Sequence, residues 1–160
     1  MIPFQYLHDL CIDRNLSIAT AESCSAGLLS SNIASIAGAS SFFKGGIISY
    51  QNKIKIDVLG VCPSIINQKT EVSSEVVEQM AQAVRCKFSA DFSIATSGYA
   101  GPTGGDKVNP IGTVFIAVSS KEKVVSKRFI LKGDRHSIVS QSVRLGVEFL
   151  IEELKNNTKT

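Results

Sequence analysis

The chain has 160 residues and a mass of 17.1 kDa, which fits a single domain over residues 1–160. Hydrophobic residues make up 44% and charged residues 19% of the sequence, a composition that excludes an intrinsically disordered protein. The net charge is only +3, and the basic residues between 121 and 132 flank or alternate along a predicted hairpin, so we expect no nucleic-acid partner.

The hydrophobic pattern predicts alternating helices and strands. In chain order, the predicted elements are a helix over 4–11, a strand over 17–21, a helix from about 25 to 37, a strand over 46–50, a short helix from 52 to about 60, a long helix from 73 or 74 to 88, strands over 92–97, 113–119 and 124–131, and a helix from 134 to 154. Gly38 is expected to end its helix, and Asn52, Asp134 and either Ser73 or Ser74 are expected to cap theirs.

The order of these elements predicts the fold class. Residues 113–119 are apolar on both faces, which is typical of a central strand, and residues 121–123 turn the chain into an antiparallel partner. Helices that alternate with strands, followed by one late antiparallel hairpin, predict a three-layer α/β/α fold with a mixed, mostly parallel central sheet.

The four cysteines indicate a reducing compartment. Cys11, Cys24, Cys62 and Cys86 show no C-x-x-C spacing and no paired histidine, so we predict free thiols that pack as small apolar residues, with no metal site. The first residues lack the features of a secretion signal, and no apolar run approaches the ~20 residues of a membrane span. We therefore expect a cytoplasmic protein with no membrane partner.

The polar turn at 22–27 is the strongest local indication of chemistry. A strand, a sharp turn and a helix in this order place Ser23 near a helix N-terminus, where backbone N–H groups favour negative charge. A serine that attacks a carbonyl needs such fixed donors for the oxyanion. The turn alone is nevertheless more typical of a helix cap, supplied by Ser23 or Ser25. Cys24 is expected to point into the core, because neighbours in an extended turn diverge.

A nucleophilic serine also needs a base. The two histidines, His8 and His136, lie far from the turn in sequence, so a serine–histidine pair is possible but unsupported. Lys55 follows Tyr50 by a strand end and a helical turn, so both can face one cleft. Burial would lower the pKa of this lysine and leave a fraction of free amine to take the proton of the serine. The alternative is an ordinary surface lysine, and the residues alone do not decide between them.

A glycine-rich loop follows the predicted strand at 92–97. Residues 98–105 match neither the phosphate-binding G-x-x-x-x-G-K-[ST] pattern nor a G-x-G-x-x-G that opens a helix. Such a loop lets backbone N–H groups approach an anion or a carbonyl closely, although a plain long turn has the same composition. Arg135, in the first turn of the last helix, is a candidate phosphate contact or the partner of a surface acid.

Ordered landmarks run along nearly the whole chain. They are Thr20-Ala-Glu-Ser-Cys24, Gly38-Ala-Ser-Ser-Phe-Phe43, Gly45-Gly46, Ser49-Tyr-Gln-Asn52 with Lys55, Leu59-Gly-Val61, Val72-Ser73, Ser97-Gly98, Ala100-Gly-Pro-Thr-Gly-Gly105, Pro110-Ile-Gly-Thr113 and Gly133-Asp-Arg135. Together they resemble the C-terminal domain family of the competence-damage-inducible protein CinA, which is also found as stand-alone nicotinamide-nucleotide amidases.

The resemblance implies an amidase that converts nicotinamide mononucleotide to nicotinate mononucleotide and ammonia, without a metal or organic cofactor. It assigns the nucleophile to Ser23, the base to Lys55 and an assisting role to Tyr50, and it implies a homodimer. The residues expected to bind the substrate are Glu22, Ser25, Gly27, Gly46, Ser97, Gly98, Ala100, Gly101, Pro102, Thr103, Gly104, Gly105 and Arg135.

The chain also departs from the family pattern. Ala26 stands where the family usually has glycine, and Tyr99 stands where a small aliphatic residue is more usual. A methyl group at position 26 restricts positive backbone φ angles, and the phenol ring at position 99 adds bulk to the loop. A non-catalytic nucleotide-binding module and an amidase for another small carboxamide are the alternative interpretations.

Overall fold

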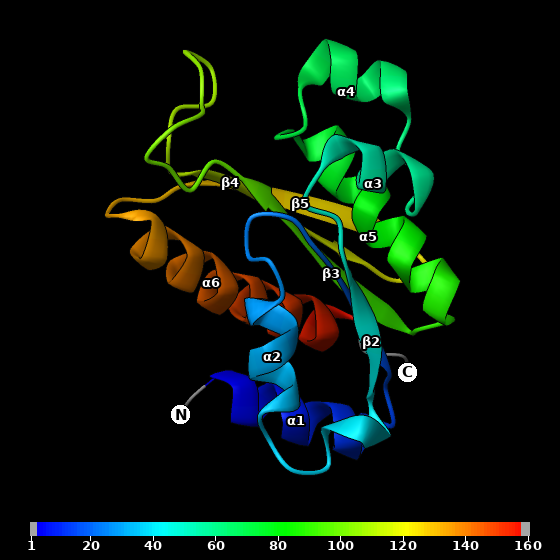
Figure 1. Ribbon diagram of the computed structural model, residues 1–160. Coiled ribbons are helices and arrows are strands. Elements are labelled where there is room, and N and C mark those ends of the chain that lie inside the picture. The colour runs from blue at the N-terminus through cyan, green and yellow to red at the C-terminus, as the bar shows by residue number, and fades with distance from the viewer. Residues whose placement is uncertain (1–2, 158–160) are drawn as a thin grey trace.

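A five-stranded sheet lies at the centre of the computed structural model, which describes residues 3–157 (Figure 1). The strands β2, β1 and β3 pair in parallel, whereas β4 runs antiparallel to both β3 and β5. Four of the five strands therefore point the same way, which confirms the predicted mixed, mostly parallel sheet with one antiparallel hairpin. The strands are β1 (Ile18–Glu22), β2 (Phe43–Ile48), β3 (Phe92–Gly98), β4 (Thr113–Ser119) and β5 (Val124–Ile130), in the order β2-β1-β3-β4-β5.

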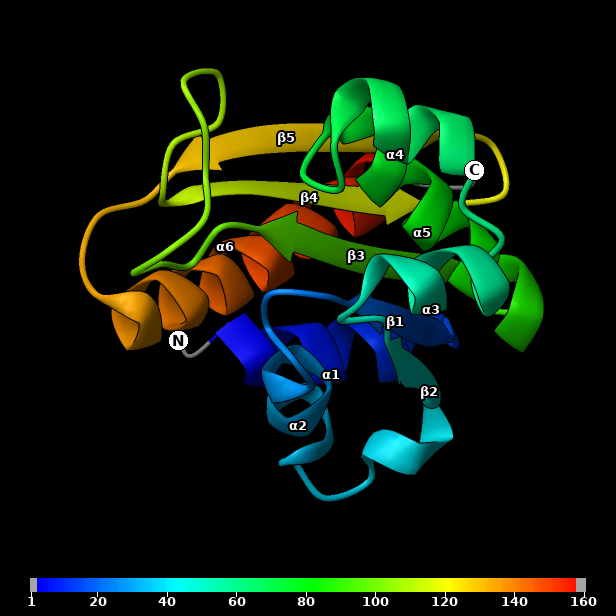
Figure 2. The same cartoon turned by 45° about the horizontal axis from the view of Figure 1, so that its top comes forward.

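Helices cover both faces of this sheet, as the predicted three-layer fold requires (Figures 1 and 2). One face carries α1 (Pro3–Arg14), α2 (Leu28–Ala34) and α6 (Arg135–Asn156), and the other carries α3 (Asn52–Asp57), α4 (Pro63–Lys69) and α5 (Ser74–Phe88). Each face has its own apolar core, and β4 is buried along its whole length. Within residues 3–157, none of the helices has the length and hydrophobicity that a membrane crossing requires.

The predicted helix caps are confirmed at two positions. The Ser73 side chain accepts a hydrogen bond from the Val76 N–H at the start of α5, and the Asp134 side chain accepts one from the Ser137 N–H at the start of α6. Asn52 is wrong as a cap, because it is the first helical residue of α3 and the flanking residue is Gln51.

Three other predictions need correction. Gly38 does not end the second helix: α2 ends at Ala34 with Ser35 as its flanking residue, and Gly38 instead precedes a short 3-10 helix over Ala39–Ser41. The helix expected from about residue 25 starts only at Leu28, because Ala26 and Gly27 have φ angles of 47° and 99°, outside the right-handed helical region. The sequence pattern also missed α4, whose first residue is Pro63. Among the cysteines, Cys11 and Cys24 are buried as expected, but Cys62 and Cys86 are exposed and do not pack in the core.

Candidate active site

The candidate active site lies at the carboxyl ends of β1 and β3. These strands are parallel neighbours, with Glu22 opposite Thr96, so the segments that follow them emerge at one edge of the sheet. A cavity of about 460 Å³ opens at this edge. Five separate segments line it, with the residues Ser23, Cys24, Tyr50, Gln51, Asn52, Lys55, Glu71, Val72, Ser97, Gly98, Tyr99, Ala100, Thr103 and Arg135.

A buried lysine contacts the serine that the sequence singled out. The Lys55 side chain is fully buried, and its Nζ lies 2.9 Å from the Ser23 Oγ and 2.9 Å from the Ser49 carbonyl oxygen. Burial lowers the pKa of Lys55 below its ordinary value of 10.5, although the nearby Glu71 carboxylate opposes this shift. A neutral amine at this position would be within proton-transfer distance of the serine hydroxyl.

The turn that presents Ser23 is built around the carboxylate of Glu22. Its Oε2 accepts hydrogen bonds from the Ser25 hydroxyl at 2.6 Å, the Gly27 N–H at 2.9 Å and the Leu29 N–H at 3.1 Å. Its Oε1 accepts from the N–H and the hydroxyl of Ser30. Because these groups surround a fully buried side chain, Glu22 holds the turn and the start of α2 instead of facing the cavity.

The adjacent Cys24 borders the same cavity, but its side chain is largely buried in the core. It is only 7% exposed and packs in the apolar core that α1, α2 and α6 share with the sheet. Burial raises the pKa of its thiol to about 11, so little thiolate is present at neutral pH. Of the two neighbouring nucleophilic side chains, Ser23 is therefore the one with a base in contact.

Ala26 adopts a left-handed backbone conformation that glycine tolerates better. Because its side chain is exposed and needs no repacking, we expect Ala26→Gly to raise the free energy of unfolding by about 0.5–1 kcal/mol. Denaturant unfolding would measure the change. Ala34→Gly is the matched control, since Ala34 is also exposed but lies in α2, where glycine should lower stability by about 1 kcal/mol. A loss of stability in both variants would contradict this interpretation.

Arg135 joins two other segments that line the site. Its Nη2 donates a hydrogen bond of 2.6 Å to the Tyr50 hydroxyl, and its Nη1 donates one of 2.7 Å to the Gly101 carbonyl oxygen. The contact between Lys55 and Tyr50 is instead through the backbone, where the Tyr50 carbonyl oxygen lies 3.4 Å from the lysine Nζ. The phenol of Tyr50 thus faces the guanidinium group, and its assisting role stays a prediction.

The expected substrate-binding residues divide into two groups. Ser97, Gly98, Ala100, Thr103 and Arg135 line the cavity together with Ser23, Tyr50 and Lys55. The second group is not among the residues that line the cavity: Glu22, Ser25, Gly27, Gly46, Gly101, Pro102, Gly104 and Gly105.

Ser25 and Gly46 show why this second group does not line the cavity. The Ser25 hydroxyl is buried between Glu22 and the Thr96 hydroxyl. A side chain at Gly46 would collide with Thr20, so this glycine lets β2 approach its neighbour. Both residues therefore support the position of the turn from behind.

Six lining residues were not among the expected site residues: Cys24, Gln51, Asn52, Glu71, Val72 and Tyr99. Cys24 was expected to point into the core, and Tyr99 was noted only as a departure from the family pattern. Gln51, Asn52 and Val72 lie within the motifs that carry the family resemblance, so the sequence could have indicated them as site residues. Glu71 precedes α5 and had no signal, because its entry into the site depends on how the segment before that helix packs beside β3.

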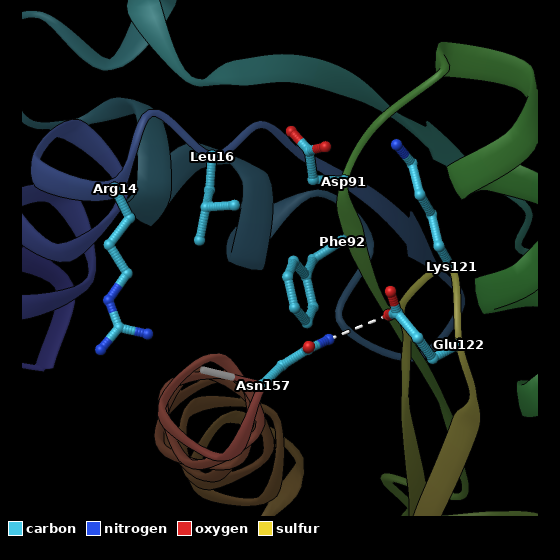
Figure 3. A pocket seen from close by; sticks show the side chains of 7 residues that line it. All are labelled: Arg14, Leu16, Asp91, Phe92, Lys121, Glu122 and Asn157. Atoms are coloured by element: carbon cyan, nitrogen blue, oxygen red, sulfur yellow. Dashed lines mark hydrogen bonds between the residues drawn. The ribbon is translucent and has the colours of Figure 1, made fainter. Parts of the chain in front are cut away.

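A second cavity of about 460 Å³ lies at the opposite end of β1 and β3 (Figure 3). Its polar groups serve the surrounding chain: Arg14 donates to the Leu154 carbonyl oxygen, and Asp91 accepts from the N–H and hydroxyl of Ser17. It has neither a serine nor a cysteine among its lining residues. The cavity beside Ser23 is therefore the candidate active site.

A family model and the similar proteins identify the same family for this chain. Residues 4–154 match the CinA C-terminal domain. A CinA-like protein of Flavobacterium psychrophilum is 40% identical over 154 residues, which cover 96% of this chain and 37% of that protein, and one of Fervidobacterium nodosum is 41% identical over 90% of this chain and 35% of its own. The chain thus spans little more than a third of the length of these relatives.

Solved structures extend this similarity to three dimensions. The structure of competence damage-inducible protein A from Klebsiella pneumoniae superimposes with a TM-score of 0.94 at 30% identity, over 98% of this chain and 97% of that one. A competence or damage-inducible protein from Enterobacter asburiae superimposes with a TM-score of 0.91 at 32% identity, over 95% and 96% of the two chains.

Proposed function

The chain belongs to the CinA C-terminal domain family, and on this premise we propose that it is an amidase that deamidates nicotinamide mononucleotide. The observation that carries the proposal is the 2.9 Å contact between the buried Lys55 amine and the Ser23 hydroxyl inside a cavity. A regulatory binding module would not need a nucleophile in contact with a buried base of lowered pKa.

The proposed reaction runs through an acyl-enzyme. The neutral Lys55 amine takes the proton of Ser23 as its oxygen attacks the carboxamide carbon, and the tetrahedral intermediate collapses when the protonated lysine gives this proton to the departing ammonia. Water then attacks the resulting ester with Lys55 again as base, which releases the nicotinate product and restores the serine. No oxidant, metal or organic cofactor enters this balance.

The proposal predicts a definite pH dependence. Lys55 must be unprotonated to act, and its pKa lies below 10.5, so kcat/KM should rise about tenfold per pH unit and level off before that value. Lys55→Met should abolish this rise of kcat/KM with pH and most of the activity. Lys53→Met is the control, because this exposed lysine pairs with Asp57 on the same helix and its loss should leave the profile unchanged. A flat wild-type profile would argue against a lysine base.

Arg135 is proposed to bind the phosphate of the nucleotide. For nicotinamide mononucleotide, Arg135→Ala should reduce the stabilisation of the transition state by about 1.5–3 kcal/mol, which is the usual contribution of a charge-assisted hydrogen bond. The riboside without the phosphate should be affected much less, because for it only the contacts of Arg135 to Tyr50 and Gly101 are lost. Steady-state kinetics on the two substrates would measure the difference, and an equal loss on both would remove this assignment.

The direct test is ammonia release from nicotinamide mononucleotide by the purified protein. Turnover that depends on Ser23 would support the proposal. Binding of the nucleotide without ammonia release would favour a non-catalytic module, and turnover of other small carboxamides in its place would favour an amidase of different specificity.

A further inference from the structure

An acidic side chain lies in the cavity beside the serine and lysine. Glu71 is the one carboxylate among the described residues that line it. Two contacts to β3 and its following loop fix this residue: its carbonyl oxygen accepts a 2.7 Å hydrogen bond from the Ser97 hydroxyl, and its Oε1 accepts a 3.2 Å bond from the Tyr99 hydroxyl. The first contact holds the backbone of Glu71 against β3, and the second orients its carboxylate toward Tyr99.

This carboxylate lacks a permanent cationic partner. Among residues 3–157, no lysine, arginine or histidine lies within salt-bridge distance of Glu71. Its electrostatic effect reaches the Lys55 amine, but this lysine must be neutral to act as the base. In the reactive state, the Glu71 carboxylate therefore has no charged protein partner within salt-bridge distance among the described residues, and the hydrogen bond to its side chain comes from the neutral Tyr99 hydroxyl.

Tyr99 adds an aromatic ring next to this charge. The residue lines the same cavity, and its ring packs over Gly104, where an added Cβ would lie 3.3 Å from the Tyr99 Cδ1. A carboxylate and an electron-rich ring favour a positively charged, planar group. The Arg135 guanidinium lines the same cavity without forming a salt bridge to Glu71, and it favours an anion, so the cavity suits a ligand that carries both charges.

We propose that Glu71 and Tyr99 form a subsite for a positively charged pyridinium ring, so that the site selects N-substituted pyridinium carboxamides over neutral ones. This inference rests on the proposed function and specifies which form of the substrate is recognised. Glu71 contributes charge attraction and Tyr99 contributes its ring face, while Ser23 attacks the carboxamide attached to the ring.

Equilibrium binding of two forms of one nucleotide tests the inference. Oxidised nicotinamide mononucleotide has a cationic ring, whereas its reduced dihydropyridine form keeps the ribose, phosphate and carboxamide but has a neutral ring. In a Ser23→Ala background, which prevents turnover, the oxidised form should bind about tenfold more tightly. Adding Glu71→Gln should remove most of this preference, since only the contribution of the Tyr99 ring remains, and leave the affinity for the reduced form nearly unchanged. Calorimetric titration would measure all four constants.

Glu75→Gln in the same background is the matched control, since Glu75 pairs with Lys69 and does not line the cavity. It should keep the full preference for the oxidised form. Equal affinities of the Ser23→Ala protein for the two forms, a preference that is undiminished by Glu71→Gln, or an equal loss for both forms would each overturn the inference while ammonia release still supports the proposed function. Binding of neither form would overturn both.

Discussion

Ser23→Ala is expected to lower kcat for ammonia release by at least about 10⁴-fold, because it removes the atom that attacks the carboxamide. The substrate should still bind, since the remaining lining residues are unchanged, and the folded protein should keep its stability because only one hydroxyl contact to Lys55 is lost. Ammonia release under saturating substrate would measure the effect, with calorimetry to show that binding is retained.

Cys24→Ala is the control that separates the two adjacent nucleophiles. Because the Cys24 thiol is buried in the core and its pKa is raised to about 11, its loss should cost some stability but leave kcat within about tenfold of the wild type. If Cys24→Ala abolished turnover while Ser23→Ala retained it, the assigned nucleophile would be wrong.

Glu22→Gln should be the most destabilising single change at the site. The carboxylate accepts five hydrogen bonds in a fully buried position, and an amide would turn one acceptor oxygen into a donor that faces other donors. We expect the free energy of unfolding to fall by about 3 kcal/mol or more, which corresponds to a decrease in Tm of roughly 6–12 °C for a domain of this size.

Glu148→Gln controls for the chemistry of the substitution. Glu148 is exposed and pairs with Arg144 on α6, so its loss should change stability by no more than about 0.5 kcal/mol. Thermal unfolding of the two variants would compare them directly. A Glu22→Gln protein as stable as Glu148→Gln would show that the turn does not depend on the buried carboxylate.

Most helices and strands could be predicted from the sequence, because apolar periodicity and capping residues act over a few neighbouring positions. The strand over 113–119 was predicted with its observed bounds, and the caps at Ser73 and Asp134 follow from polar side chains placed just before apolar periodic runs. The start of α2 was misplaced because a left-handed conformation at Ala26, a residue with high helix propensity, leaves no mark in the sequence.

The candidate active site could be predicted from the sequence only in part. The sequence singled out Ser23 and Lys55, but it counted Glu22 as a substrate contact, whereas the structure shows a carboxylate enclosed by the amides and hydroxyls of its own turn. Sequence spacing could not distinguish these roles, because adjacent residues in a turn point in different directions. The position of Glu71 beside Lys55 had no sequence signal at all.

The sequence by itself determined the alternation of helices and strands and the residue types needed for a serine–lysine pair, since apolar periodicity and turn residues act over a few positions. Only the tertiary structure decided that Lys55 is buried against Ser23, 32 positions away, and that Arg135 contacts Tyr50, 85 positions away. These distances depend on the parallel register of β1, β2 and β3 and on the helices packed against them, and burial in that packing is what lowers the pKa of Lys55.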